Sequence, residues 1–141
     1  MVRGRLLAES LRLGHDLRVR DLVVTRIGRH DVSTSTAPDE TTPNQRAVDS
    51  SGGAAEMQPT VWTFLDFEAP DADADQLARA LADALVAENG WYADFLVAED
   101  HVVVFAGRVF RYRLGDEAGR AAAVEYGLAA GTPPGQLDWG E

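Results

Sequence analysis

A polar stretch at residues 33–58 divides this sequence into two parts of different composition. It contains Pro38, Pro43 and the run Ser50-Ser51-Gly52-Gly53, and it has almost no large apolar side chains. Such a stretch cannot bury enough apolar surface to offset the entropy lost on ordering. Because closing a long loop costs little stability, we expect a flexible or disordered insert within one α+β domain that spans residues 1–141.

The segments on either side of this insert have the composition of strands. Residues 2–11 and 17–27 are expected to pair as a hairpin, and the β-branched side chains of Val23 and Ile27 support the second of these strands. Residues 60–67 carry large apolar side chains at both odd and even positions. This pattern predicts a central strand of which both faces are covered.

Residues 71–89 show the clearest helical pattern in the sequence. Leu77, Leu81 and Leu85 recur four residues apart and would form one apolar stripe. Aspartates precede the stripe, where the helix dipole favours negative charge. The pair Asn89-Gly90 is typical of a left-handed stop, so we expect one helix over the whole range.

The remainder of the chain predicts three more strands and a second helix. The strands are expected at residues 91–98, 101–106 and 109–114, and the helix at 117–130, where Gly131 ends it. The resulting order is β-β-(flexible insert)-β-α-β-β-β-α. We therefore predict an α+β fold with a mainly antiparallel sheet of about five strands and two helices packed on one face.

The net charge of −10 is unevenly distributed. Residues 1–32 hold seven arginines against four acids, whereas residues 59–141 hold five arginines against fifteen acids. This acidic character disfavours general binding to nucleic acid and favours a basic protein partner. No stretch approaches the ~18 apolar residues of a membrane-spanning helix, so we expect a cytoplasmic protein with no membrane association.

The residue types that are missing exclude several kinds of chemistry. Without cysteine, the chain has no disulfides, thiol nucleophile or cysteine-ligated zinc. All thirteen cationic residues are arginines, which excludes a lysine Schiff base and the lysine of a phosphate-binding loop. This arginine usage, together with abundant alanine, glycine, valine and aspartate, indicates a GC-rich genome, as in actinobacteria.

No motif in the sequence predicts a metal ion, a cofactor or a catalytic residue. The run that starts at Asp71 resembles a calcium loop, but Gln76 replaces its glycine and Ala82 its final acid. The histidines lack the spacing of metal ligands, and no serine lies in a G-x-S-x-G turn. The three histidines are His15, His30 and His101.

Two carboxylates interrupt otherwise apolar strand faces. Asp66 lies beside Phe64 and Asp94 beside Tyr92, an environment that would form a semi-buried pocket with raised pKa values. The alternative is that both lie on a solvated sheet face. The aromatic side chains of these strands are either core residues or an exposed binding surface. The candidate ligand-binding residues are Trp62, Asp66, Trp91, Tyr92, Asp94 and His101.

One strand combines arginines with aromatic side chains. Arg108, Arg111 and Arg113 alternate with Phe110 and Tyr112, a pattern that can stack on bases or bind an anion. The alternative interpretation is an edge strand in which arginine prevents pairing with other sheets.

Three short runs resemble a group of uncharacterised actinobacterial proteins. They are Gly90-Trp-Tyr-Ala-Asp-Phe, Val104-Phe-Ala-Gly-Arg-Val-Phe-Arg-Tyr and Gln136-Leu-Asp-Trp. The resemblance covers about the last 80 residues. It implies no activity, because no function is known to us for that group.

Three hypotheses about function follow. The first is a non-catalytic acidic binding protein, for example one that binds a basic protein. The second is a small-ligand-binding protein or enzyme with a pocket near Asp66, Asp94 and His101. The third is a self-associating protein, for example a homodimer, that pairs through residues 2–11 or 109–114.

Overall fold

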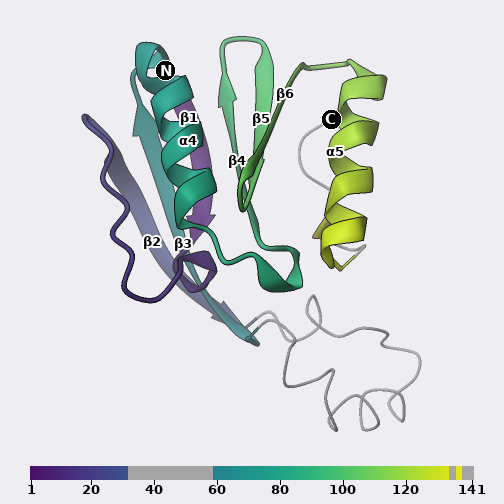
Figure 1. Ribbon diagram of the computed structural model, residues 1–141. Helices are drawn as coiled ribbons and strands as arrows, with labels where there is room; N and C mark the ends of the chain where they lie inside the picture. The colour runs from purple at the N-terminus through teal and green to yellow at the C-terminus, as the bar shows by residue number, and fades with distance from the viewer. Residues whose placement is uncertain (32–58, 134–135, 138–141) are drawn as a thin grey trace, which may run out of the picture.

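The computed structural model (Figure 1) describes residues 1–31, 59–133 and 136–137, so the insert expected at residues 33–58 lies outside the described residues. The described residues form an antiparallel sheet with the order β2-β3-β1-β4-β5-β6, together with two α-helices. The predicted α+β class and the order of elements are confirmed, with six strands rather than about five. The strands are β1 (Val2–Leu7), β2 (Val23–Asp31), β3 (Val61–Ala69), β4 (Tyr92–Val97), β5 (Asp100–Phe105) and β6 (Arg108–Arg113); the helices are α4 (Ala74–Ala84) and α5 (Glu117–Ala130).

Strand β1 lies in the middle of the sheet, between β3 and β4. The predicted hairpin of residues 2–11 with 17–27 is therefore wrong, because β2 pairs with β3 and not with β1. Opposite charges face one another where β1 meets β3: Arg3 pairs with Glu68, and Arg5 with Asp66. Cross-strand pairs of opposite charge favour this arrangement over a local hairpin.

Residues 8–22 leave the sheet between β1 and β2. They begin with a short 3₁₀ turn, η1 (Ala8–Ser10), and continue as an irregular segment up to Val23. The strand predicted at 17–27 thus begins six residues later than expected. Four apolar side chains of this segment pack against the core beside α4 instead, whereas Leu13 is exposed. The four are Leu11, Leu17, Val19 and Leu22.

Helix α4 is shorter than the range predicted at residues 71–89. A 3₁₀ turn, η2 (Asp71–Asp73), precedes it, and Leu85 after its end is extended and forms a β-bridge with Leu11. The backbone N–H of Val86 then donates to the carbonyl of Ser10. Pairing with the segment after β1 therefore ends the helix before the expected stop at Asn89-Gly90, which forms part of the turn η3 (Glu88–Gly90).

The two helices pack on opposite faces of the sheet, and the prediction of one shared face is wrong. Leu77 and Leu81 of α4 lie in one core cluster with Phe95 and Val102, whereas Ala123 of α5 lies in a second cluster with its own strand residues. Those residues are Val103, Phe105 and Tyr112, which alternate along β5 and β6 with the residues that face α4. The apolar residues on the two faces of these strands are therefore covered by different helices. Figure 1 shows α4 over β1 and α5 beside β6.

Candidate functional site

Polar side chains from all six strands form a row across the face that α5 partly covers. The register places Arg26 opposite Asp66, Asp66 opposite Arg5, and Arg5 opposite Asp94. Residues directly opposite one another share a face of the sheet. Hydrogen bonds continue the row from Asp94 onto β5 and β6. We call these residues the polar row: Arg26, Asp66, Arg5, Asp94, His101 and Tyr112.

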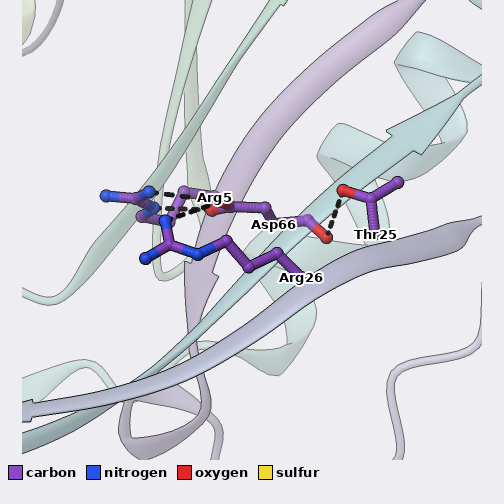
Figure 2. Close-up of polar contacts among 4 residues, drawn as sticks. All are labelled: Arg5, Thr25, Arg26 and Asp66. Carbon is purple, nitrogen blue, oxygen red and sulfur yellow. Dashed lines mark hydrogen bonds and ion pairs between the residues drawn. The ribbon is translucent and has the colours of Figure 1, made fainter.

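Asp66 is the best-connected member of the polar row (Figure 2). Arg5 donates from Nε to Oδ1 at 2.6 Å and from Nη2 to Oδ2 at 3.2 Å. Nη1 of Arg26 lies 3.5 Å from Oδ2 on the other side. The hydroxyl of Thr25 donates to the Asp66 backbone carbonyl at 3.3 Å. Two guanidinium groups from different strands therefore hold one carboxylate.

The contact between Arg5 and Asp66 keeps both side chains in their charged forms. The hydrogen bond from Arg5 holds the pKa of Asp66 below its ordinary value, and it outweighs the opposing effect of burial. The same bond raises the pKa of Arg5. The raised pKa expected for Asp66 is therefore wrong: a cationic partner on the neighbouring strand, rather than an apolar pocket, surrounds this carboxylate.

The other half of the row contains a buried histidine. His101 Nε2 lies 2.8 Å from Oδ2 of Asp94, and its Nδ1 lies 3.1 Å from the hydroxyl of Tyr112. An ionised carboxylate can only accept, so the ring proton is assigned to Nε2, and Nδ1 accepts from the tyrosine. His101 is only 1% exposed. This chain of bonds satisfies both nitrogens of a buried ring.

A shallow cavity of about 460 Å³ opens over the middle of the polar row. Asp66 and Asp94 both line it, and Arg5 lies between them in the register. His101 is hydrogen-bonded to Asp94 from the buried side. The structure thus brings together three of the residues singled out in the sequence. Arg3 and Glu68 complete the charged lining, so that the cavity carries both signs.

The aromatic candidates belong mainly to the core. Trp62 is 8% exposed and Trp91 is 5% exposed, and their rings lie 5.9 Å apart. Tyr92 is half-buried, and its hydroxyl donates to the backbone carbonyl of Gln136. Of the two interpretations left open for these aromatics, packing agrees with the structure, because neither tryptophan forms an exposed surface.

The arginines of β6 do not gather at one place. Arg108 stacks on Phe110 at 4.8 Å on the α5 side, whereas Arg111 and Arg113 point to the α4 side. There Arg111 binds Asp100 at 2.8 Å and also reaches α4. Because β6 is an edge strand with its arginines engaged by neighbours, the predicted anion site does not form from these three residues.

Sequence reasoning missed the arginines of the polar row. Arg5 and Arg26 carry no motif, and each meets Asp66 only through pairing between segments far apart in the chain. The available signal was the alternation of Arg3 and Arg5 in a strand-like segment, since alternate residues share a face. The alternation predicts that Arg3 and Arg5 share one face of a strand, but it does not predict which acidic residues they bind.

The other histidines are far from metal-binding arrangements. His30 packs edge-on against Phe64 with ring centroids 5.3 Å apart, and Nδ1 of His15 accepts from Arg12 at 3.2 Å. Within residues 1–31, 59–133 and 136–137, no group of three or more histidines and acids is placed to hold a metal ion. Among the helices of the same residues, none is both long and apolar enough to span a membrane.

Exposed acids concentrate on a different surface, which we call the α4 acidic surface. It comprises Asp71, Asp75, Asp83 and Glu88 along η2, α4 and η3, with Arg79 as the cation in the same stretch. All four acidic residues are exposed. Arg111 approaches Asp75 at 3.4 Å, and the N-terminal amine binds Asp71 at 2.5 Å. Arg12 also donates to the backbone carbonyl of Asp83, and within the part of the chain that the structure describes the carboxylates of Asp83 and Glu88 form no ion pair.

Comparison with protein-family models, curated proteins and solved structures found no match to this chain. Its function is therefore argued from its own residues.

Proposed function

We propose that this protein is a non-catalytic binding protein that uses its α4 acidic surface to bind a basic protein. The observation that carries this proposal is that paired charges and exposed acidic residues lie on different surfaces of the protein. The polar row consists of mutually paired charges, whereas the α4 acidic surface, from Asp71 to Glu88, has an excess of acids exposed to solvent.

The polar row argues against acid–base catalysis at its centre. A general acid or base works best when its pKa lies near the working pH. Asp66 has the opposite property, because Arg5 lowers its pKa and keeps it ionised. Arg5 is likewise held in its charged form. Such a pair suits the positioning of strands or the recognition of charge better than proton transfer.

The α4 acidic surface supports a basic partner on electrostatic grounds. Clustered charges of one sign raise the local concentration of an oppositely charged partner and accelerate its association. Asp75 and Asp83 are exposed on α4, and Glu88 follows in η3. Because these groups are solvated, the attraction should depend strongly on salt.

A paired-variant pull-down tests this proposal. The protein and its Asp75→Asn/Asp83→Asn variant would be immobilised and exposed to extract at about 0.05 M and about 0.5 M salt, with mass spectrometry of the bound proteins. The matched control is Glu117→Gln/Glu125→Gln on α5, which changes the net charge by the same amount and replaces exposed acids.

We expect a basic protein that is retained at low salt by the parent protein and the α5 control, and lost by the α4 variant. Calorimetry with that purified protein should then give at least a fivefold weaker affinity for the α4 variant, equivalent to about 1 kcal/mol. Equal retention by both variants, or partners that are insensitive to salt, would contradict the proposal.

A second candidate function is the binding of a small ligand at the polar row. Its support is the cavity of about 460 Å³ that Asp66 and Asp94 line together with Arg5. Groups of both signs around one cavity suit a small zwitterion, such as an amino acid. Amide shifts at Gly4, Glu68 and Leu96 on titration with free amino acids would support this candidate, and unchanged spectra at millimolar concentrations would exclude it for this ligand class.

A further inference from the structure

A second cavity lies on the other face of the sheet, between α4 and the segment of residues 11–22. It has a volume of about 520 Å³. Its floor comes from the sheet and α4, and its outer wall from the segment that includes Leu11, Leu17 and Leu22. Most of the lining is apolar, and it includes Leu6, Leu22, Leu65, Phe67, Leu77 and Leu81.

The size and lining of this cavity are those of a ligand site. Small-molecule pockets commonly measure about 300–1,000 Å³ and combine an apolar lining with a few polar groups. Leu77 and Leu81 are completely buried on the floor, whereas Leu17 and Leu22 of the outer wall are only half-buried. An apolar ligand would therefore make its contacts mainly with the partly exposed wall, above a floor whose leucines are already covered.

The polar groups of the lining are all contributed by residues 15–18. They are His15, Asp16 and Arg18, and Arg18 lies 3.7 Å from Asp16 with both side chains largely exposed. Nη2 of Arg12 donates to Nδ1 of His15 at 3.2 Å, which leaves the proton of a neutral His15 ring on Nε2. The lining thus holds one guanidinium group, one imidazole donor and one carboxylate, and Arg12 is not part of it.

We propose that this cavity binds a molecule with an apolar chain that ends in a carboxylate, such as a medium-chain fatty acid. The chain occupies the space between α4 and the outer wall, and the carboxylate meets Arg18 and the Nε2–H of His15. The charges of Arg18 and Asp16 balance, and the Nε2–H of His15 adds a second donor group for a carboxylate head. This site lies on the face opposite the polar row.

Calorimetric titration of the full chain with hexanoate, octanoate and decanoate tests the apolar part of the proposal. Burial of one methylene strengthens binding by about fourfold, so each step of two methylenes should tighten the Kd about 15-fold until the cavity is full. An affinity that does not change with chain length would overturn the proposal.

Two substitutions locate the site. Leu22→Trp places a larger side chain in the outer wall and should weaken decanoate binding at least tenfold, whereas Leu128→Trp, on the exposed side of α5, should leave it unchanged. Equal binding by both variants would contradict the assignment. Methyl shifts in the parent protein give a check that needs no variant: Leu65 and Leu81 should move on binding, and movement confined to Leu128 would overturn the site.

Comparison of decanoate with decanol tests the head group. Arg18→Ala should weaken decanoate binding about two- to fivefold, as expected for an exposed charge contact, and should leave decanol binding unchanged. If decanol binds the parent protein as tightly as decanoate does, the proposed recognition of a carboxylate is wrong.

Discussion

Arg5 binds Asp66 through two parallel hydrogen bonds, Nε to Oδ1 at 2.6 Å and Nη2 to Oδ2 at 3.2 Å. The two residues lie opposite one another on β1 and β3 and are 61 positions apart in the sequence. A slip of one residue in this pairing would move Asp66 to the other face of the sheet. The pair therefore favours one register for strands that the chain brings together from a distance.

Loss of the Asp66 carboxylate should lower the stability of the fold. In Asp66→Asn the bidentate pair with Arg5 is lost, and because the Arg5 side chain is about half exposed, we expect a decrease of about 1 kcal/mol in the free energy of unfolding. Glu68→Gln is the control, since the Arg3–Glu68 contact is longer and more exposed; its cost should be below about 0.5 kcal/mol. Urea denaturation measures both, and equal costs would contradict the special role of Asp66.

The contribution of Asp66 should also depend on pH in one direction. Its folded-state pKa lies below the ordinary value of 3.8, so the ionised form stabilises the fold above that pH and the contribution disappears as pH falls through the folded pKa. The difference in unfolding free energy between the parent protein and Asp66→Asn should be constant from about pH 7 to pH 5 and shrink towards about pH 3. A difference that grows on acidification would refute this linkage.

The hydrogen bond between Tyr112 and the buried His101 should contribute to the stability of the fold. Tyr112→Phe removes the hydroxyl that donates to Nδ1 of His101, which is 1% exposed. A buried acceptor without its donor costs about 1–3 kcal/mol. Tyr126→Phe is the control, because its ring packs between Phe105 and Phe110 and the substitution keeps that ring. Thermal unfolding should separate the two variants, and equal melting temperatures would count against the bond.

Gly4 occupies a position where the strands approach closely. A methyl group there would lie 2.5 Å from the carbonyl oxygen of Asp94 and from Cβ of Phe95. Gly4→Ala should therefore cost about 3 kcal/mol. Gly107→Ala, at a φ of 71° but with open space around it, should cost only about 1–2 kcal/mol from backbone strain. Denaturation curves of the two variants test this order, and a reversed order would contradict the packing around β1.

Periodicity predicted the elements of this fold but not their arrangement. Leu77 and Leu81 identify the buried face of α4, and the apolar residues of β4 and β5 identify covered strands. Which helix covers which face is a property of the whole sheet. The sequence of α5 indicates its buried face only weakly. One of its contacts is made by Gly127, which has no side chain and so lets Leu137 and Phe105 approach the helix closely. Such a contact adds nothing to an apolar stripe.

The sequence likewise predicted some residues of the candidate site but not how the strands bring them together. Asp66 and Asp94 stand out because each interrupts an apolar strand face, and they do line one cavity. Arg5, which lies between them, was not singled out, since its role depends on β1 being inserted between β3 and β4. Without that insertion, an apolar environment and a raised pKa were the natural expectation for Asp66.

The central claim about the polar row is that Arg5 holds Asp66 as a fixed charge and makes it unsuited to proton transfer. Its most direct test is a carboxyl ¹³C NMR titration of Asp66 in the folded protein. Because the hydrogen bond from Arg5 lowers the pKa of this group, we predict a midpoint below the ordinary value of 3.8. A midpoint above 3.8, shifted towards the working pH that suits a general acid, would contradict the claim.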